Sequence, residues 1–532
     1  MPTLHGKNIA FRFQDQAKYA AITNYLPRSR VVPDPKDQYP TLLIKHGLEE
    51  YKVLTNLGVK NVPHPITNRS VYDYPGHYVP MPHQIETAAF LSKHHRCFVF
   101  NEQRTGKTIS SLWAADYLMR EGLVKKCLII TTISTMKDVW AEHVFQHLSN
   151  RHSVVLHGSK SKRLKALDML DMDFYIINHD GVKVIEQELI ARDDIDLIIV
   201  DEASYLRSGS SDRYKRFAAM LRPTQRLWLM TGTPCSTGPT DAWALAKLIN
   251  PAGVPKYFTR FKQQTMTQIT NFKWVPKPDA YKVAFDAMQP AIRIKKRDVI
   301  LNLPPLTFEY REVELTHSQE KAYKQMHNLL VLEAQGEGGG TITAVNAADK
   351  LNKLRQVCLG VVRNSEGNYQ EIDYGNRYNV LKECIEEAGD KAKVIIFVPF
   401  KGILRSLTDK LRADGYTCEF VNGDVSANRR SEIFGAFKTQ DNPQILLAHP
   451  QVAAHGLELA VSSDIIWYGP QFSFEIFDQA NARIASGQQK NAMTITCLYA
   501  TKMERGIYEV LKSRERGQNS ILDLYKREVG II

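Results

Sequence analysis

Short apolar runs, rich in β-branched residues and separated by polar segments, recur along the chain in two groups. The first group consists of CFVF (97–100), CLIITT (127–132), FYIIN (174–178), IDLIIVD (195–201) and RLWLMTG (226–232). The second consists of KVIIFV (393–398), TCEFV (417–421), QILLAH (444–449), DIIWYG (464–469) and TITCLY (494–499). Such runs are typical of buried parallel strands joined by helices. The pattern predicts an α/β protein with two doubly wound parallel-sheet lobes in tandem.

The segments outside these groups predict further parts of the molecule. No comparable strand series occurs near the N-terminus, and prolines punctuate that stretch, so we expect a small accessory domain there. The expected boundaries are 1–75 for the accessory domain, 76–250 for the first lobe, 251–305 for an inter-lobe link rich in Lys, Phe, Tyr and Pro, and 306–532 for the second lobe. Within the second lobe we expect a helical insertion at about 316–370, interrupted by GEGGG (336–340).

The amino-acid composition limits the classes of binding partner and the cellular compartment that we expect. The 532 residues include 69 Lys and Arg against 57 Asp and Glu, which suits a polyanion such as nucleic acid but equally a merely soluble basic protein. The seven cysteines form no C-x-x-C pair, which indicates buried thiols in a reducing compartment. Because the N-terminus is polar and no apolar run approaches the length of a bilayer span, we expect a soluble cytoplasmic protein with no membrane partner.

A phosphate-binding loop is indicated where the first apolar run ends. That strand leads into NEQRTGKT (101–108), and a helix-like segment follows, which is the order that phosphate binding needs. In this chemistry Gly106 lets backbone amides approach phosphate, Lys107 neutralises the β- and γ-phosphates, and the Thr108 hydroxyl ligates Mg²⁺. Asn101 departs from the leading Gly of the general pattern. The alternative interpretation is a solvated basic turn.

Two carboxylates end another strand of the first group. The run IDLIIV delivers Asp201 and Glu202 at its carboxyl end, where ligands bind in open α/β sheets. There Asp201 can hold Mg²⁺ through water, while Glu202 can orient or deprotonate the water that attacks the γ-phosphate. The alternative is an ordinary acidic turn, so the order and spacing after the phosphate-binding loop carry the prediction.

Two other polar positions fit the same chemistry. TGTP (231–234) follows the next strand and is placed to sense the γ-phosphate, unless it is a tight turn without a role. Gln84 precedes a helix-like segment and offers one donor and one acceptor, as adenine recognition by its base edge demands. Taken singly, Gln84 is no better than a surface residue.

Together these segments resemble a known family. Gln84, NEQRTGKT, DEAS and LMTGTP occur in the order of helicase superfamily two, and the second half of the chain resembles its SWI/SNF branch. The matching segments are LPPLTFEYREVELTHSQEKAYKQM (303–326), LRQVCLG (354–360), NGD (422–424) with Arg429, Arg430 and Phe437, and AHPQVAAHGLELAVSSDIIWYGPQFSFEIFDQANAR (448–483). The resemblance runs from about residue 75 to nearly the end of the chain, in a form similar to compact bacteriophage members.

The resemblance implies a nucleotide cleft between two RecA-like lobes, with ATP and Mg²⁺ as cofactors. Beside the loop residues already named, it assigns nucleotide contacts to Gln84, Arg104, Thr105 and Gly456, and Mg²⁺ to Thr108 and Asp201. Arg483 matches the first arginine of motif six, which reaches the γ-phosphate in this family. Such an arginine accelerates phosphoryl transfer by roughly 10³–10⁵-fold. A surface helix position is the alternative for Arg483.

Motif six also departs from the family. The pattern Q-x-x-x-R-x-x-R-x-G-Q stands here as QANARIASGQ (479–488), so that Ser486 replaces the second arginine and one residue before Gly487 is missing. If that arginine normally contacts the γ-phosphate, hydrolysis is slow here or another arginine substitutes for it. Arg429 and Arg430 are the candidates. Arg104, where many family members have Gly, is a lesser departure.

Three other features have their own interpretations. His143 and His147 stand four residues apart, but Val144 occupies the place of the zincin Glu, so we expect a wet helix face without metal. The basic run IRIKKRDVI (292–300) predicts phosphate-backbone contact or a solvated strand or hairpin. Residues 25–60 weakly resemble the domain that precedes the motor in annealing-helicase relatives, which suggests a substrate-recognition or scaffold module.

The leading hypothesis is an ATPase that translocates on double-stranded DNA as a monomer and remodels what it meets, in the host cytoplasm if a bacteriophage encodes it. The preference for DNA over RNA follows from the resemblance, because composition indicates only a polyanion. One alternative is a nucleotide-gated clamp on nucleic acid with weak turnover. Another is an RNA-directed helicase.

Overall fold

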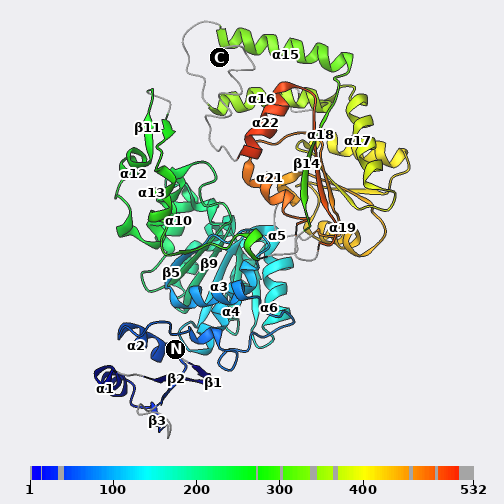
Figure 1. Cartoon of the computed structure of the whole chain (residues 1–532). Coiled ribbons are helices and arrows are strands. Elements are labelled where there is room, and N and C mark those ends of the chain that lie inside the picture. The colour runs from blue at the N-terminus through cyan, green and yellow to red at the C-terminus, as the bar shows by residue number, and fades with distance from the viewer. Residues whose placement is uncertain are drawn as a thin grey trace. The chain divides into compact units, whose positions relative to one another are not determined.

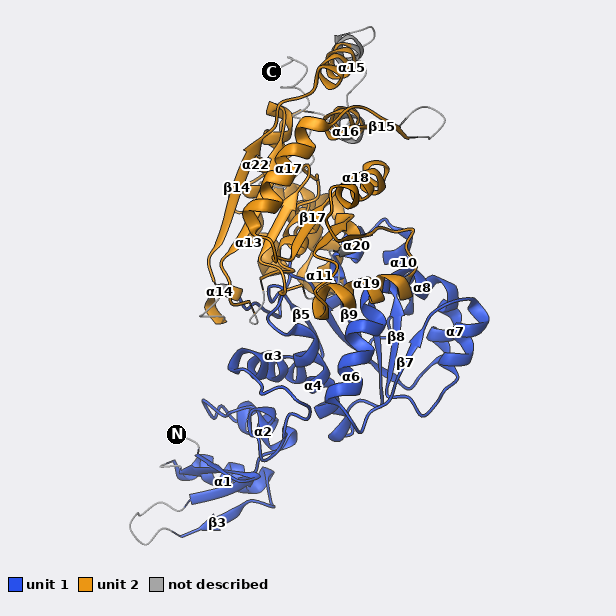
Figure 2. Cartoon of the chain, turned by 90° about the vertical axis from the view of Figure 1, so that its right-hand side faces the viewer, with its two compact units in different colours: residues 1–232, 248–250, 288–295 blue, residues 233–247, 251–287, 296–532 orange. Residues whose placement is uncertain are grey.

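The computed structural model describes residues 3–12, 15–33, 41–270, 274–299, 304–335, 344–363, 369–453, 459–485 and 489–513. The chain forms two compact units, coloured separately in Figure 2. Unit 1 comprises residues 1–232, 248–250 and 288–295, and unit 2 comprises 233–247, 251–287 and 296–532. Gly456, Ser486, Gly487 and the GEGGG segment lie outside the described residues.

The N-terminal part of unit 1 is an antiparallel sheet with two helices (Figure 1). Its strands, in sheet order, are β1 (Thr3–His5), β2 (Asn8–Arg12), β4 (Thr41–Lys45) and β3 (Arg30–Val32), and its helices are α1 (Gln16–Tyr25) and α2 (Leu48–Asn56). Alternate residues of β2 and β4 point to one face, and Ile9, Phe11, Leu42 and Ile44 form the core there. Residues 1–75 therefore contain a small sheet of their own.

The rest of unit 1 is built on a parallel sheet of seven strands. In sheet order these are β13 (Ala291–Ile292), β5 (Arg96–Val99), β10 (Arg226–Met230), β9 (Ile195–Asp201), β6 (Lys126–Thr131), β8 (Phe174–Asn178) and β7 (Ser153–Leu156). The main helices are α3 (Pro82–Lys93), α4 (Lys107–Arg120), α6 (Glu142–His147), α7 (Lys160–Leu167), α8 (His179–Val182), α9 (Glu186–Ala191) and α10 (Asp212–Met220). Figure 1 shows α3, α4 and α6 over one face of this sheet. Every apolar run of the first group is a strand here, as predicted.

Helix α4 fills the centre of this unit. Its residues from Ile109 to Met119 are all buried, which is typical of a helix enclosed on every side. Asp116 is among them, and its carboxylate accepts hydrogen bonds from the Tyr72 hydroxyl (2.9 Å), Arg120 (2.9 Å) and Arg151 (2.7 Å). These partners offset the cost of burying a charge. They also tie the segment that follows the N-terminal sheet to the helix.

Unit 2 contains a parallel sheet of six strands. In sheet order these are β14 (Leu306–Glu312), β21 (Met493–Tyr499), β20 (Asp464–Trp467), β17 (Val394–Phe397), β19 (Ile445–Ala448) and β18 (Cys418–Val421). The helices are α15 (His317–Gln335), α16 (Ala344–Leu359), α17 (Gly375–Ala388), α18 (Lys401–Ala413), α19 (Ala427–Thr439), α20 (Pro450–Ala453), α21 (Phe474–Asn481) and α22 (Lys502–Ser513). The two predicted parallel-sheet lobes are thus confirmed, and α15 and α16 occupy the expected insertion.

The segment expected to link the lobes is divided between the two units. It contains α12 (Phe258–Thr265), the hairpin strands β11 (Met266–Gln268) and β12 (Trp274–Pro276), α13 (Ala280–Ala287) and α14 (Lys296–Val299). Between them, β13 adds an edge strand to the sheet of unit 1, where Ala291 pairs with Phe98. The described part of the basic run, 292–299, is therefore the end of a strand followed by a short helix, because only Ile292 pairs with a neighbouring strand there.

The interpretation of His143 and His147 as a wet helix face is wrong for His147. Its ring is buried and stacks on Tyr78 with 4.2 Å between ring centroids. Its Nδ1 also accepts a hydrogen bond from the backbone N–H of His77 (3.3 Å). The side chain is buried because residues 76–78 cover it, which helical spacing alone does not reveal.

All seven cysteines are buried and none is in a disulfide. Among the described residues, no helix has both the length and the apolar character needed to cross a membrane.

Candidate nucleotide site

The predicted phosphate-binding loop, the TGTP segment and the acidic pair of unit 1 lie at the carboxyl ends of three neighbouring parallel strands. Strand β10 lies between β5 and β9, and its residue Met230 is in register with Val99 on one side and Asp201 on the other. The phosphate-binding loop follows Val99, and TGTP begins directly after Met230. Asp201 itself ends β9. The sheet therefore brings these three segments to one edge, although they are far apart in the sequence.

The phosphate-binding loop has the backbone geometry of a turn into a helix. Gly106 is the N-cap of α4 and has φ +80°, which favours glycine because it carries no Cβ. Lys107 begins the helix, and its Nζ donates to the carbonyl oxygens of Asn101 (2.8 Å) and Glu102 (3.2 Å). Its ammonium group therefore lies over the loop. Backbone N–H groups at the start of a helix are suited to phosphate.

Gln84 and His83 on α3 pack directly on this loop. A Cβ at position 106 would overlap Nε2 of Gln84, so the absence of a side chain at Gly106 permits the observed approach. The Gln84 Oε1 accepts from the backbone N–H of Met81 (3.0 Å), which orients the side chain. His83 Nε2 lies 2.9 Å from the carbonyl oxygen of Thr105, and burial lowers the pKa of this histidine. The neutral ring then donates from Nε2, because a carbonyl only accepts.

The two departures in the loop have structural explanations. The Asn101 amide donates to the Thr87 hydroxyl (2.9 Å), and its oxygen accepts from the backbone N–H of Ile294 (2.9 Å). Asn101 thus joins the loop to α3 and to the segment after β13, which a glycine could not do. Arg104 has φ +67°, a left-handed conformation in which a non-glycine residue is strained. A glycine would adopt this conformation without strain.

The acidic pair is also held in a defined conformation. Asp201 Oδ2 accepts from the Thr131 hydroxyl (3.2 Å) and the Trp140 indole (3.1 Å), and its Oδ1 accepts from the backbone N–H of Glu202 (3.1 Å). Glu202 has φ +52°, so the chain turns sharply directly after the strand. The acidic pair therefore lies at a sharp turn at the end of β9.

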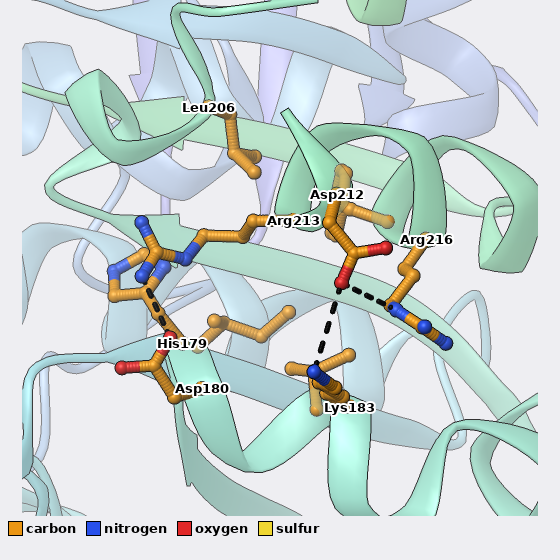
Figure 3. A pocket seen from close by; sticks show the side chains of 10 residues that line it. His179, Asp180, Lys183, Leu206, Asp212, Arg213 and Arg216 are labelled. Atoms are coloured by element: carbon orange, nitrogen blue, oxygen red, sulfur yellow. Dashed lines mark hydrogen bonds and ion pairs between the residues drawn. The ribbon is translucent and has the colours of Figure 1, made fainter. Parts of the chain in front are cut away.

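A cavity of about 220 Å³ opens beside this acidic loop (Figure 3). His179 lines it, stacks on Tyr205 with 4.6 Å between centroids, and contacts the carbonyl oxygen of Asp201 (3.0 Å) through Nε2. The rim carries ion pairs, which are Arg213–Asp180 (2.6 Å), Arg216–Asp212 (2.9 Å) and Lys183–Asp212 (3.9 Å). Since these cations already have carboxylate partners, the rim offers little net charge to a phosphate.

In unit 2, Arg483 follows α21 and is only 7% exposed. Its carbonyl oxygen accepts from Leu459 N–H (3.1 Å), and its own N–H donates to Ala480 (3.2 Å). Nearby, the Asn481 side chain accepts from the Trp467 indole (2.8 Å). These contacts fix the backbone from which Arg483 projects. The alternative interpretation, an exposed helix residue, does not fit this burial.

The two candidate substitutes for the missing arginine differ in their surroundings. Arg429 is paired with Glu419 and Glu432, both at 3.1 Å, and is 53% exposed. Arg430 is half-buried, and its Nε, although buried, has no hydrogen-bond partner among the described residues. An arginine that two carboxylates already neutralise is the poorer candidate for phosphate contact. The geometry therefore favours Arg430.

Sequence reasoning identified the LRQ segment but gave Arg355 no role. Its guanidinium lies over two rings, 4.4 Å from the centroid of Phe472 and 5.0 Å from that of Phe400. It donates to the Pro470 carbonyl and to Asn352 (2.6 Å), and burial lowers its pKa to about 10. Arg355 thus fastens α16 to the loop that precedes α21. In the sequence, the only sign of this role was that the arginine lies close to the apolar end of a predicted helix.

Comparisons with known proteins show which protein family matches the chain. A family described as "SNF2-related domain" matches residues 64–360, more than half of the chain, and "Helicase conserved C-terminal domain" matches 376–487. The chain is 22% identical to "Chromodomain-helicase-DNA-binding protein 3 homolog" of Caenorhabditis elegans, over 81% of this chain and 26% of that protein. The chain thus spans about a quarter of the length of this relative.

One relative is comparable in length. "Putative protein p41" of Acyrthosiphon pisum secondary endosymbiont phage 1 is 24% identical, over 84% of this chain and 98% of that protein. Among solved structures, "Sulfolobus solfataricus SWI2/SNF2 ATPase core in complex with dsDNA" is 19% identical with a TM-score of 0.41, covering 86% of this chain and 95% of that one.

Proposed function

Because the chain belongs to the SNF2-related family, we propose that it is an ATP-dependent motor that translocates on duplex DNA and remodels the DNA or the proteins bound to it. The observation that carries this proposal is the common edge of unit 1, where Lys107, TGTP and Asp201 leave three adjacent strands in register. A phosphate-binding loop beside an acidic pair is the arrangement needed to cleave a nucleoside triphosphate.

In this proposal the nucleotide binds at the loop. Backbone N–H groups from Arg104 to Thr108 and the Lys107 ammonium group hold the phosphates, while Gln84 reads the adenine edge. The packing of Gln84 against Gly106 supports this placement, because it joins base recognition to phosphate recognition. Thr108 and Asp201 would hold Mg²⁺, which neutralises phosphate charge when bound.

Hydrolysis requires an attacking water and stabilisation of the charge that develops on the phosphate. We propose that Glu202 orients the water and accepts its proton, since it directly follows Asp201 at the end of β9. We propose that Arg483 stabilises the transition state, with Gly456 of motif five also contacting the nucleotide. Arg430 would take the place of the arginine missing at Ser486, since Arg429 is engaged by two glutamates.

DNA is the proposed track. The net charge of +12 suits a polyanion, and similar proteins are named for DNA binding. We further propose action as a monomer in the cytoplasm of a bacterial host, supported by similarity over nearly the whole length of a phage protein.

The decisive experiment measures steady-state ATP hydrolysis without nucleic acid and with duplex DNA, single-stranded DNA and structured RNA at one fixed salt concentration. We expect the strongest stimulation by duplex DNA and no hydrolysis by Lys107→Ala. Glu202→Gln should bind ATP but not turn it over, because Asp201 and Lys107 remain. The motor would be excluded if no nucleic acid stimulated the rate of hydrolysis and Lys107→Ala left that rate unchanged. If RNA gave the strongest stimulation, the proposed substrate would change from DNA to RNA.

The departure in motif six favours one second candidate, a clamp in which ATP binding switches the grip on nucleic acid while turnover is weak. Restoring an arginine at Ser486 separates the two. If the missing contact limits turnover, Ser486→Arg raises the rate of hydrolysis. An unchanged rate together with a strong loss in Arg430→Ala indicates that Arg430 already supplies the contact.

A further inference from the structure

The segment of residues 256–287, here called the aromatic–basic module, forms a small substructure in unit 2. Helices α12 and α13 pack on each other through the buried side chains of Phe261 and Thr265 on α12 and of Ala280, Ala284 and Ala287 on α13. The backbone N–H of Lys277 donates to the carbonyl of Thr265 (3.0 Å), which closes the base of the β11–β12 hairpin between the helices. In Figure 1 the hairpin extends beyond both helices. The inner face is thus fully used in packing.

Four large aromatic side chains of this module are exposed. Tyr257 is 61% exposed, Phe258 43%, Tyr281 49% and Phe285 48%. Among the described residues only eight Phe, Tyr and Trp side chains are exposed to this degree, and half of them lie in this short module. Tyr281 and Phe285 are four residues apart on α13, so they lie on the same side of the helix. Such a concentration of exposed aromatic surface marks an interaction site.

The charge around these rings identifies the class of partner. The module contains six basic residues and two acidic ones. Lys262 Nζ lies 4.1 Å from the centroid of the Trp274 ring, and Lys256 Nζ lies 5.5 Å from that of Tyr257. The core of a protein interface is depleted of lysine, whereas exposed rings among cations are what single-stranded nucleic acids bind. Bases stack on the rings, and phosphates contact the cations.

We propose that the aromatic–basic module binds unpaired nucleotides, with bases stacked on Tyr281 and Phe285 and phosphates held by Arg260 and Lys282, two exposed basic residues of the same module. A paired base cannot stack on a side chain without leaving the duplex, so the ligand is a single strand, such as the open arm of a fork. This inference rests on the proposed DNA motor. It adds a substrate preference, because a motor with this module should bind a junction between paired and unpaired DNA more tightly than a plain duplex.

The test is DNA binding by the full chain without ATP, measured by fluorescence anisotropy on a single strand, a blunt duplex of the same sequence and a fork. The double variant Tyr281→Ala/Phe285→Ala should bind the single strand and the fork arm at least about tenfold more weakly, with less than about a twofold change on the duplex. Arg260→Ala/Lys282→Ala should weaken all three and reduce the slope of log affinity against log salt concentration by about one or two. Phe145→Ala, which removes a 79% exposed ring from unit 1, is the matched control and should change nothing.

Equal losses on duplex and single strand in the aromatic variant, or wild-type binding to both, would overturn the proposal. The conservative pair Tyr281→Phe and Phe285→Tyr should retain single-strand binding, so a general folding defect in the alanine variant would not leave the question open. ATP hydrolysis without DNA should be unchanged in every variant. Failure of the motor would appear separately, as hydrolysis by the wild-type chain that duplex DNA does not stimulate.

Discussion

The nucleotide edge of unit 1 and the arginine-bearing edge of unit 2 are built by different means. In unit 1 the backbone sets the site, because Arg104, Gly106 and Glu202 all have positive φ and place their neighbours at the ends of registered strands. In unit 2 the side chains set it, because buried arginines fasten one element to another. Arg355 joins α16 to the loop before α21, and Arg377 pairs with Glu504 at 2.6 Å where both are almost fully buried.

The difference predicts how each region fails. A change in unit 1 alters the conformation of a short loop and should act on nucleotide binding. A change in unit 2 leaves a buried charge or carbonyl without its partner, which destabilises the lobe and displaces motif six. Substitutions in unit 1 should therefore mainly change KM for ATP, whereas substitutions in unit 2 should mainly change kcat.

Removal of Arg483 should have the largest effect. We expect Arg483→Ala to lower kcat by about 10³-fold or more with little change in KM for ATP, because an arginine finger acts mainly in the transition state. Lys107→Ala should instead lose nucleotide binding. Steady-state kinetics and an independent measurement of ATP affinity distinguish the two variants. An equal loss of ATP affinity in both would contradict the difference proposed between unit 1 and unit 2.

Replacement of Arg355 should have the next largest effect. Arg355→Met keeps much of the side-chain volume but leaves the Pro470 carbonyl without its donor, so we expect unfolding to cost about 2 kcal/mol less. The activity should fall through kcat, with KM for ATP unchanged, because the loop before α21 loses its attachment. Denaturant unfolding and steady-state kinetics measure the two effects. Arg405→Met is the matched control, because Arg405 lies on the exposed side of α18 and its replacement should change neither quantity.

Most parallel strands of both lobes were predictable because they are buried on two faces and therefore apolar throughout. β14 was missed because none of its residues is fully buried, and β7 because only Leu156 is fully buried. The four antiparallel strands in the N-terminal part of unit 1 are only three to five residues long.

The candidate site was predictable to a different extent. Lys107, Asp201 and Glu202 could be proposed from the sequence because their segments follow buried strands, at the carboxyl ends where ligands bind in open α/β sheets. The contact between Gln84 and Gly106 and the Asn101 bridge depend on how α3 and β13 pack on the loop, which no local pattern encodes. Arg355 was missed for the same reason, since its partners Phe400 and Phe472 lie on other elements.

Acid should weaken the fold of unit 1 at its buried histidines. Burial lowers the pKa of His64 to about 3 and that of His147 to about 4, so both are neutral in the folded chain where the unfolded chain is protonated. The free energy of unfolding should therefore decrease as the pH falls below about 6.5, by roughly 1 kcal/mol per pH unit for each group. Chemical denaturation at several pH values measures this slope. His147→Phe should reduce it while keeping the stack on Tyr78, and an undiminished slope would assign the acid sensitivity elsewhere.

The smallest effect tests whether the unit 1 loop is strained. Arg104→Gly removes the cost of a left-handed residue, about 1–2 kcal/mol, but adds conformational freedom to the unfolded chain, about 0.5–1 kcal/mol. The net stabilisation should therefore be between about 0 and 1.5 kcal/mol. Arg104→Ala keeps the strained backbone and removes the side chain, so the difference between the two variants in thermal unfolding isolates the backbone contribution. If strain at residue 104 does not shape the loop, glycine will be no more stable than alanine, and the backbone origin of this site will be limited to Gly106 and Glu202.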